Sequence, residues 1–143
     1  MKKLLVLLVG SLALAPIMAQ SAEVTVYKSA TCGCCNKWSQ HLEQNGFSVS
    51  AHNVKDLVSF KTQHGVMPQL SSCHTAIVDD YVIEGHVPAE DVKRLLRERP
   101  NAWGLAVAGM PIGSPGMEQG NRKDRYNVIL VDKQGNTSVF ASH

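Results

Sequence analysis

Three cysteines occupy four consecutive positions of the sequence. Cys32, Cys34 and Cys35 follow a short run of strand-forming residues and begin a segment that can fold as a helix. At a helix N-terminus, free backbone N–H groups and the positive end of the helix dipole favour the thiolate form of cysteine, which binds metals and attacks disulfides. The residue types and their spacing therefore predict either metal binding or thiol–disulfide chemistry here.

The middle cysteine separates these two chemistries. Cys32 and Cys35 alone form a C-x-x-C redox pair, but Cys34 offers that pair a competing partner and would disturb a clean two-electron exchange. Soft Cu(I) suits closely packed thiolates, which can bridge several copper ions. Zinc is the weaker candidate, because structural zinc sites usually combine two separated pairs of ligands. The cluster therefore favours copper over zinc or disulfide exchange.

The fourth cysteine, Cys73, precedes the strand-like run TAIV. In the fold predicted below, that strand borders the start of the cysteine-bearing helix, so Cys73 can add a fourth sulfur. One alternative is that Cys73 has only a packing role. Another is a metal-free site in which the four cysteines form two disulfides, one of them between Cys34 and Cys73. His74 follows directly, but successive strand residues face opposite ways, so both side chains point inward only if the segment is irregular.

Three further side chains are candidate neighbours of the sulfurs. His86 lies near the end of a predicted hairpin and can overhang the site, although a local hydrogen bond is the simpler role. Met110 and Met117 lie in a Gly- and Pro-rich segment, 101–120, that is predicted to be irregular. A loop of about 20 residues is uncommon in a small domain unless it has a task such as covering a site. The two methionines are therefore candidate Cu(I) ligands, with plain hydrophobic packing as the alternative. His41 is predicted to be solvated.

The elements that must position these residues alternate between strand and helix. The pattern places strands at 24–29 and 47–54, helices from the cysteines to the C-cap pair Asn45 and Gly46, at 56–64 and at 89–99, and hairpins at 74–87 and 126–140. The order β-α-β-α-β-β-α predicts an α/β fold with a thioredoxin-like mixed sheet flanked by helices. The Gly/Pro/Met-rich loop and the C-terminal β-hairpin follow it.

Length and charge limit the classes of function. The chain has 143 residues, of which 44% are hydrophobic and 18% charged, as expected for one globular domain. Apart from Lys2 and Lys3, basic and acidic residues balance at 12 each. This balance gives no support to binding of nucleic acid or of a membrane surface through a basic field.

The first residues resemble an export signal. Lys2 and Lys3 precede the apolar run 4–15, and small residues follow from Ala19 onward. This pattern predicts a signal peptide over residues 1–22, cleaved between Ala19 and Glu23, and a single mature domain over 23–143. The alternative is an uncleaved membrane anchor, which the shortness of the apolar run disfavours. Export would place the cysteines in the oxidising periplasm.

Four motifs in combination carry a family resemblance that extends over nearly all of the mature chain, 23–140. TCGCCNKW, QLSSCHTA, EGHVPAEDVKRLL and GLAVAGMPIGSPGME together resemble the CopG-like periplasmic copper-resistance proteins. The resemblance implies a thioredoxin-like fold, a multinuclear copper cluster held by cysteines, and a part in copper resistance through Cu(I)/Cu(II) interconversion. By motif, the ligands would be Cys32, Cys34, Cys35 and Cys73, with Met110, Met117 and His86 as neighbours.

The leading hypothesis is a periplasmic copper-binding protein that holds several Cu(I) ions and detoxifies copper or changes its oxidation state. Its partners would be copper ions and other periplasmic copper-handling proteins. One alternative is a thiol–disulfide oxidoreductase in which Cys32 is the nucleophile and Cys35 the resolving thiol. Another is a passive chaperone that hands over copper without redox chemistry. The sequence leaves open which of these is correct and whether the protein is an enzyme.

Overall fold

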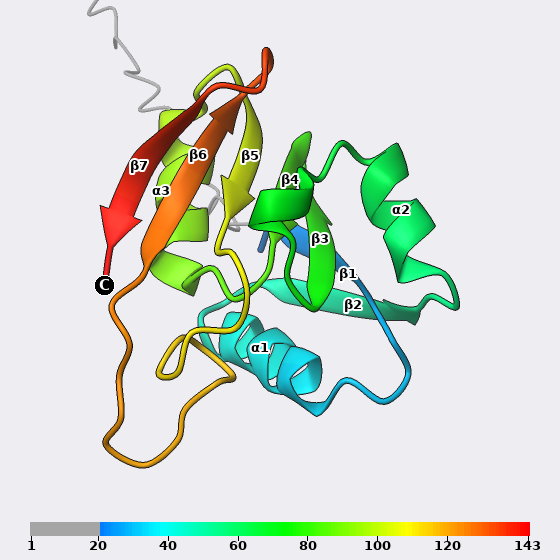
Figure 1. The fold of residues 1–143 in the computed structure, drawn as a ribbon, viewed down its shortest axis with the longest axis vertical. Coiled ribbons are helices and arrows are strands. Elements are labelled where there is room, and N and C mark those ends of the chain that lie inside the picture. The colour runs from blue at the N-terminus through cyan, green and yellow to red at the C-terminus, as the bar shows by residue number, and fades with distance from the viewer. Residues whose placement is uncertain (1–20) are drawn as a thin grey trace, which may run out of the picture.

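One mixed sheet of seven strands organises the computed structural model, which describes residues 21–143 (Figure 1). The strands are β1 (Glu23–Lys28), β2 (Ser48–Asn53), β3 (His74–Val78), β4 (Tyr81–Glu84), β5 (Ala102–Ala106), β6 (Asn127–Asp132) and β7 (Thr137–Ser142). The helices are α1 (Gly33–Gln44), α2 (Leu57–Gln63) and α3 (Ala89–Glu98), with a short 3₁₀ turn, η1 (Pro68–Leu70). The predicted signal peptide lies outside the described residues except for its last two.

The order of the strands confirms the predicted fold. The sheet runs β2-β1-β3-β4-β5-β6-β7. Strands β1 and β2 are parallel and are connected through α1, whereas β3 pairs antiparallel with both β1 and β4. A β-α-β unit followed by a β-β-α unit on one sheet is the thioredoxin-like arrangement, and β6 and β7 extend it as the predicted C-terminal hairpin.

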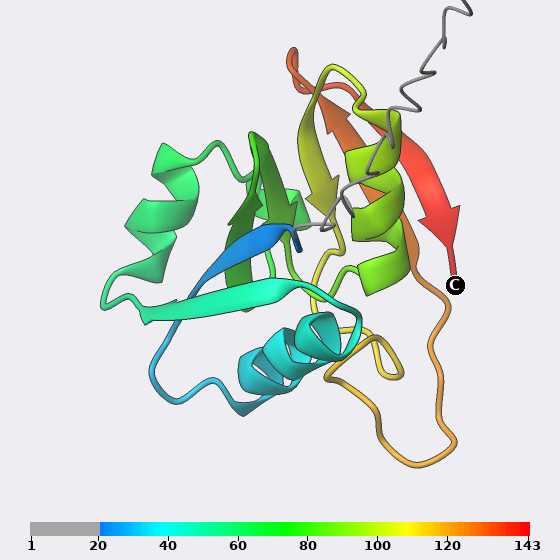
Figure 2. The same cartoon turned by 180° about the vertical axis from the view of Figure 1, so that it is seen from behind.

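The main hydrophobic core lies between the sheet and two of the helices. From α1 come Trp38 and Leu42, and from α3 come Val92 and Leu95, all without solvent exposure. Helix α3 lies behind β5 and β6 in Figure 1 and in front of them in Figure 2. The sheet residues of this core alternate along their strands and include Val24, Val26, Ala76, Val78 and Ile83.

The third helix, α2, makes a different kind of contact. Its single buried residue is Lys61, whose ammonium group donates hydrogen bonds to Thr75 of β3 and Glu84 of β4. Thr75 and Glu84 are opposite each other in the β3–β4 ladder. Because Thr75 alternates with Ala76 along β3, this pair faces away from the main core and toward α2.

Strand β5 corrects the prediction that residues 101–120 form one irregular segment. Ala102–Ala106 is a central strand between β4 and β6, and most of its residues are buried. A Cβ atom on Gly104 would lie 1.8 Å from the Val82 carbonyl oxygen, so this glycine permits close approach of β5 to β4 instead of breaking the strand. Between β5 and β6 the chain is irregular, as predicted, apart from an isolated bridge between Gln119 and Arg122.

None of the helices in residues 21–143 is both long enough and apolar enough to span a membrane.

Candidate metal centre

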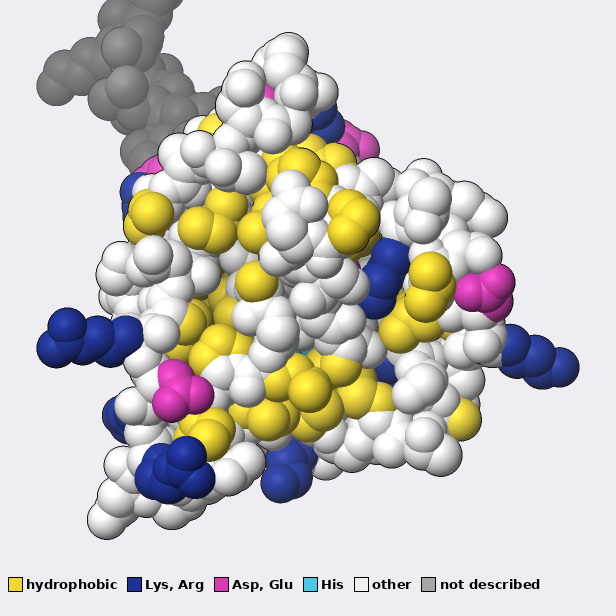
Figure 3. All heavy atoms as spheres, in the orientation of Figure 1, with side chains coloured by type: hydrophobic (Ala, Val, Ile, Leu, Met, Phe, Trp, Pro, Cys, Tyr) yellow, Lys and Arg dark blue, Asp and Glu magenta, His cyan; other side chains and the backbone are white. Residues whose placement is uncertain are grey.

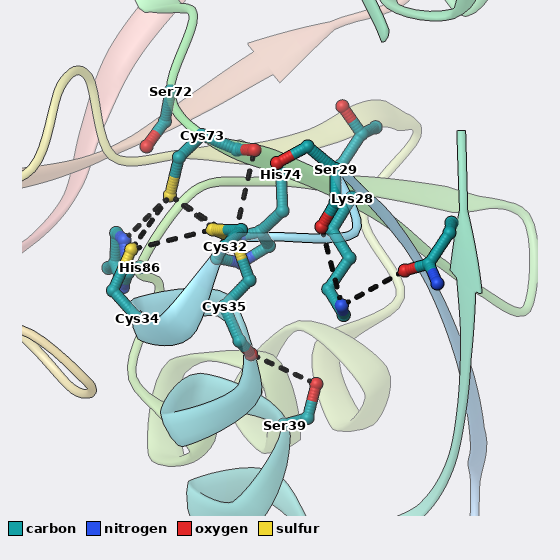
Figure 4. The surroundings of a disulfide bond; sticks show 12 residues. Lys28, Ser29, Cys32, Cys34, Cys35, Ser39, Ser72, Cys73, His74 and His86 are labelled. Atoms are coloured by element: carbon teal, nitrogen blue, oxygen red, sulfur yellow. Dashed lines mark hydrogen bonds between the residues drawn. A yellow bond between two sulfur atoms is a disulfide. The ribbon is translucent and has the colours of Figure 1, made fainter. Parts of the chain in front are cut away.

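The topology brings the start of α1 beside the start of β3. Cys32 is the N-cap residue of α1, and Cys34 and Cys35 lie in its first turn, as predicted. Strand β1 leads into this helix, and its last residue, Lys28, is opposite His74 in the β1–β3 ladder. Cys73, directly before His74, therefore faces the helix start (Figure 4).

The four sulfur atoms form a closed ring. Cys34 Sγ lies 3.5 Å from Cys32 Sγ and 3.6 Å from Cys73 Sγ. Cys73 Sγ also lies 3.6 Å from Cys35 Sγ. A disulfide between Cys32 and Cys35 closes the ring. All four sulfurs lie within 4.8 Å of one another, so in the reduced protein one cluster of thiolates would be available to soft metal ions.

The disulfide shows that crowding does not prevent the C-x-x-C pair from closing. Sequence reasoning favours free thiolates at this position, whereas the structure joins Cys32 to Cys35 and leaves Cys34 and Cys73 as free thiols. The second disulfide of the metal-free alternative, between Cys34 and Cys73, is not formed. The ring therefore has an oxidised form with two thiols, and its reduction would give a form with four.

Burial raises the pKa of the Cys73 thiol to about 12, and its contact with Cys34 adds to the rise. Without a metal, Cys73 therefore carries its proton at neutral pH, and a metal ion must displace that proton to bind the sulfur. Apolar side chains gather over the N-terminal part of α1 on the face shown in Figure 3. These surroundings favour neutral groups over isolated charges.

His86 is placed as an acceptor beside the ring. Its Nε2 lies 3.0 Å from Cys73 Sγ, and its Nδ1 lies 2.8 Å from the carbonyl oxygen of Pro115. A carbonyl oxygen only accepts, so Nδ1 carries the proton and Nε2 keeps a free lone pair toward the sulfur. Burial lowers the pKa of His86, which favours this neutral form. A histidine held in this way is prepared to accept the thiol proton or to bind a metal.

His74 also faces the site, which the rule of strand alternation did not predict. Cys73 lies in a bend before β3, so alternation does not apply to this pair, and His74 Nδ1 lies 3.5 Å from Cys73 Sγ. The imidazole of His74 packs against the indole of Trp38 with ring centroids 4.4 Å apart, and His74 is fully buried. Its Nε2 has no hydrogen-bond partner among the described residues. Burial, with a smaller effect from His86, holds the pKa of His74 well below its usual value.

The loop between β5 and β6 covers the helix start with its backbone. A Cβ atom on Gly116 would lie 2.7 Å from the Cys34 carbonyl oxygen and 2.9 Å from the Trp38 amide nitrogen. Pro115 in the same segment binds His86. Of the two methionines, Met117 is partly buried next to this contact, whereas Met110 is 51% exposed. The loop therefore has the predicted covering role, and ligation by its methionines remains a prediction.

Two polar contacts near the site had no sequence signal. His41, predicted to be solvated, accepts a hydrogen bond through Nε2 from the amide of Ala89, the first residue of α3. Burial lowers the pKa of His41. The Lys61–Glu84 pair is the second contact, and burial raises the pKa of Glu84 even though Lys61 opposes that rise. Each of these residues looks like an ordinary polar residue until the fold supplies its partner.

The fold and the site define a thioredoxin-like protein with a cysteine cluster able to bind metal. Two solved structures, described as "Copper resistance protein copG", Form 2 and Form 1, are each 45% identical to the chain, with TM-scores of 0.84 and 0.82. They match 87% of this chain and 99% and 98% of their own. A family model described as "Protein of unknown function, DUF411" matches residues 70–117. No curated protein is detectably similar in sequence.

The chain belongs to the CopG family of copper-resistance proteins.

Proposed function

We propose that this protein is exported to the periplasm and binds several Cu(I) ions on one thiolate cluster. Its signal peptide would be residues 1–22, and its single mature domain residues 23–143. The ligands would be Cys32, Cys34, Cys35 and Cys73, with His86, Met110 and Met117 as neighbours. The observation that supports this proposal is the closed ring of four sulfurs at a helix start, because thiolates at this spacing can be shared between soft univalent ions.

The same ring supports a role in Cu(I)/Cu(II) interconversion. Oxidation of the Cys32 and Cys35 thiols to their disulfide releases two electrons and two protons, which balances reduction of two Cu(II) ions to Cu(I). The reverse reaction oxidises two Cu(I) ions and restores the two thiols. His86 Nε2 lies where it can take up a proton from Cys73 as copper binds that sulfur. Copper handling of this kind would give copper resistance, with other periplasmic copper proteins as partners in exchange.

Anaerobic Cu(I) titration of the reduced mature protein tests the proposal. We expect more than one equivalent of copper, and a loss of copper in Cys34→Ser. The matched control is Asn36→Ser, an exposed residue two positions further along α1, which should bind as the parent does. A copper stoichiometry that Cys34→Ser leaves unchanged would exclude the cluster.

The Cys32–Cys35 disulfide favours a second candidate function, thiol–disulfide exchange. Cys32 at the N-cap is partly exposed and Cys35 is fully buried, as in a nucleophile and its resolving thiol. Disulfide-reductase activity that survives Cys34→Ser and is indifferent to copper would support this function over copper binding.

A further inference from the structure

The segment that carries Cys73 lies between η1 and β3, where no strand ladder fixes it. Three hydrogen bonds join this segment to Glu84 of β4 and to Gly109 in the loop after β5. The Ser72 amide donates to Glu84 Oε1 at 2.7 Å, the Ser72 hydroxyl donates to the Gly109 carbonyl oxygen at 2.5 Å, and the Gly109 amide donates to the Ser71 carbonyl oxygen at 3.1 Å. The position of Cys73 Sγ in the ring therefore depends on groups outside the ring.

Glu84 holds this segment on both sides of the Cys73–His74 dipeptide. While Oε1 accepts from the Ser72 amide, Oε2 accepts from the Thr75 hydroxyl at 2.6 Å. Lys61 Nζ completes the arrangement with hydrogen bonds of 2.5 Å to Glu84 Oε1 and 2.9 Å to Thr75 Oγ1. One carboxylate thus binds the residues that flank the dipeptide, and one ammonium group neutralises it.

The burial of this pair argues for a positional role. The Glu84 side chain has no solvent exposure and that of Lys61 has 10%. Removing two charges from water is costly, and apolar side chains of similar volume often give equal or greater stability. An apolar pair, however, cannot bind the Ser72 amide or the Thr75 hydroxyl. What the ion pair adds over apolar packing is a fixed direction for the segment between them.

We propose that Glu84, neutralised by Lys61, is a positioning residue that holds Cys73 within reach of the cysteines at the start of α1. Its role in copper binding rests on the proposed function. Its effect on the position of Cys73 does not, because Cys34 Sγ lies 3.6 Å from Cys73 Sγ and provides a metal-free measure of that position.

The experiment uses the mature chain with Cys32→Ser and Cys35→Ser, so that Cys34 and Cys73 are the only thiols. Diamide oxidises them to an intramolecular disulfide, and mass spectrometry after alkylation of the remaining thiols gives the rate. We expect Lys61→Met/Glu84→Leu to lower this rate about tenfold or more, since a displacement of ~1 Å can cost about 100-fold in an oriented reaction. Removing two buried charges favours the fold, whereas the Ser72 amide and the Thr75 hydroxyl lose their partners, so the two effects oppose each other and the thermal midpoint is measured beside the rate.

Two further variants distinguish a positional effect on the rate from the effect of a general loss of stability. Thr75→Val keeps the shape of the side chain, removes one of the two flanking contacts, and should slow the reaction by a smaller factor. Val128→Ala creates a cavity in β6, three strands from β3 in the sheet order, and should leave the rate unchanged despite lower stability. A double variant that couples its thiols as fast as the parent would overturn the proposal. So would an equal slowing in Val128→Ala.

Copper titration of the four-cysteine protein separates this proposal from the proposed function. If both hold, Lys61→Met/Glu84→Leu loses as many copper equivalents as Cys73→Ser does. If the parent binds no copper while the double variant still slows disulfide formation, the proposed function fails and the positioning role stands. If the double variant binds as much copper as the parent, Glu84 does not position a ligand.

Discussion

The sulfur atoms of Cys34 and Cys73 lie 3.6 Å apart although 39 positions separate the two residues in the chain. The fold accounts for this proximity, because β1 ends beside the start of β3 and leads directly into α1. The cysteines at the start of α1 and the cysteine before β3 are therefore neighbours, at the end of the sheet where β1 ends and β3 begins. Their contact turns a C-x-x-C pair into a ring of four sulfurs.

Closing the Cys32–Cys35 disulfide should lower the capacity of the protein for Cu(I). A sulfur in a disulfide is not a thiolate, so the oxidised ring keeps only Cys34 and Cys73 as thiol ligands. We expect the oxidised protein to take up fewer copper equivalents in an anaerobic titration than the reduced protein. Reducing the oxidised protein and then removing the reductant should restore the full copper capacity. Equal capacities would show that these two sulfurs do not bind copper.

Gly116→Ala should lift the covering loop from the start of α1. The new Cβ would come within 3.0 Å of backbone atoms of Cys34 and Trp38, which cannot move aside as a flexible side chain can. Gly135→Ala is the matched control, because its φ of +88° equals that of Gly116 within a degree while nothing lies within 4 Å. We expect a chelator to remove copper faster from Gly116→Ala than from Gly135→Ala. Equal rates would mean that the loop does not retain copper.

Local signals in the sequence were sufficient to predict most of the elements. Asn45 and Gly46 end α1 as predicted, and Pro88 and Pro100 bracket α3. Strand β5 was missed because Gly104 is a breaker by local rules. Its role as a point of close approach exists only once β4 lies beside it.

The candidate site was predicted only where spacing or strand order carried the information. The spacing of Cys32, Cys34 and Cys35 predicted three members of the ring, and the order of strands predicted Cys73. His74 was missed because alternation holds within a strand and not in the bend before it. The Lys61–Glu84 pair was missed because a buried ion pair has no local pattern, since each partner depends on the burial of the other.

The stability of the metal-free protein should depend on pH through His41. Its Nε2 must be unprotonated to accept a hydrogen bond from the Ala89 amide. Burial lowers the pKa of His41 from the usual 6.5, Glu118 opposes this with a smaller effect, and Lys93 adds slightly to the lowering. Below pH 6.5 the unfolded chain binds more protons at this residue than the folded chain. The contribution of His41 is therefore complete above pH 6.5 and is lost as the pH falls through its lowered pKa.

The measurement is the difference in unfolding free energy between the parent and His41→Ala. We expect this difference to be about 0.5–2 kcal/mol at pH 7.5, the usual value of a helix N-cap, and to shrink toward pH 5. Taking the difference cancels the contribution of His74, whose pKa is also lowered by burial. A difference that stays constant across this range would show that His41 is not the titrating cap of α3.

Trp38→Phe should destabilise the protein by about 1–3 kcal/mol, the cost of leaving a buried polar group without its partner. Trp38 is fully buried, and its Nε1 donates a hydrogen bond of 2.9 Å to the carbonyl oxygen of Val87, the residue after His86. Phenylalanine fills most of the same space but cannot donate, so that carbonyl oxygen loses its partner inside the core.

Trp103→Phe provides the matched comparison for this loss. Trp103 Nε1 donates a bond of similar length, 2.8 Å, to the His64 carbonyl oxygen, but this tryptophan is only partly buried. Water can replace its lost bond, so we expect a smaller loss of stability in Trp103→Phe. Urea unfolding followed by circular dichroism measures both variants without depending on tryptophan fluorescence. Burial of the Val87 carbonyl is what should make the Trp38 hydrogen bond costly to remove. Equal losses of stability in the two variants would therefore contradict the prediction that the buried bond of Trp38 contributes more than the partly exposed bond of Trp103.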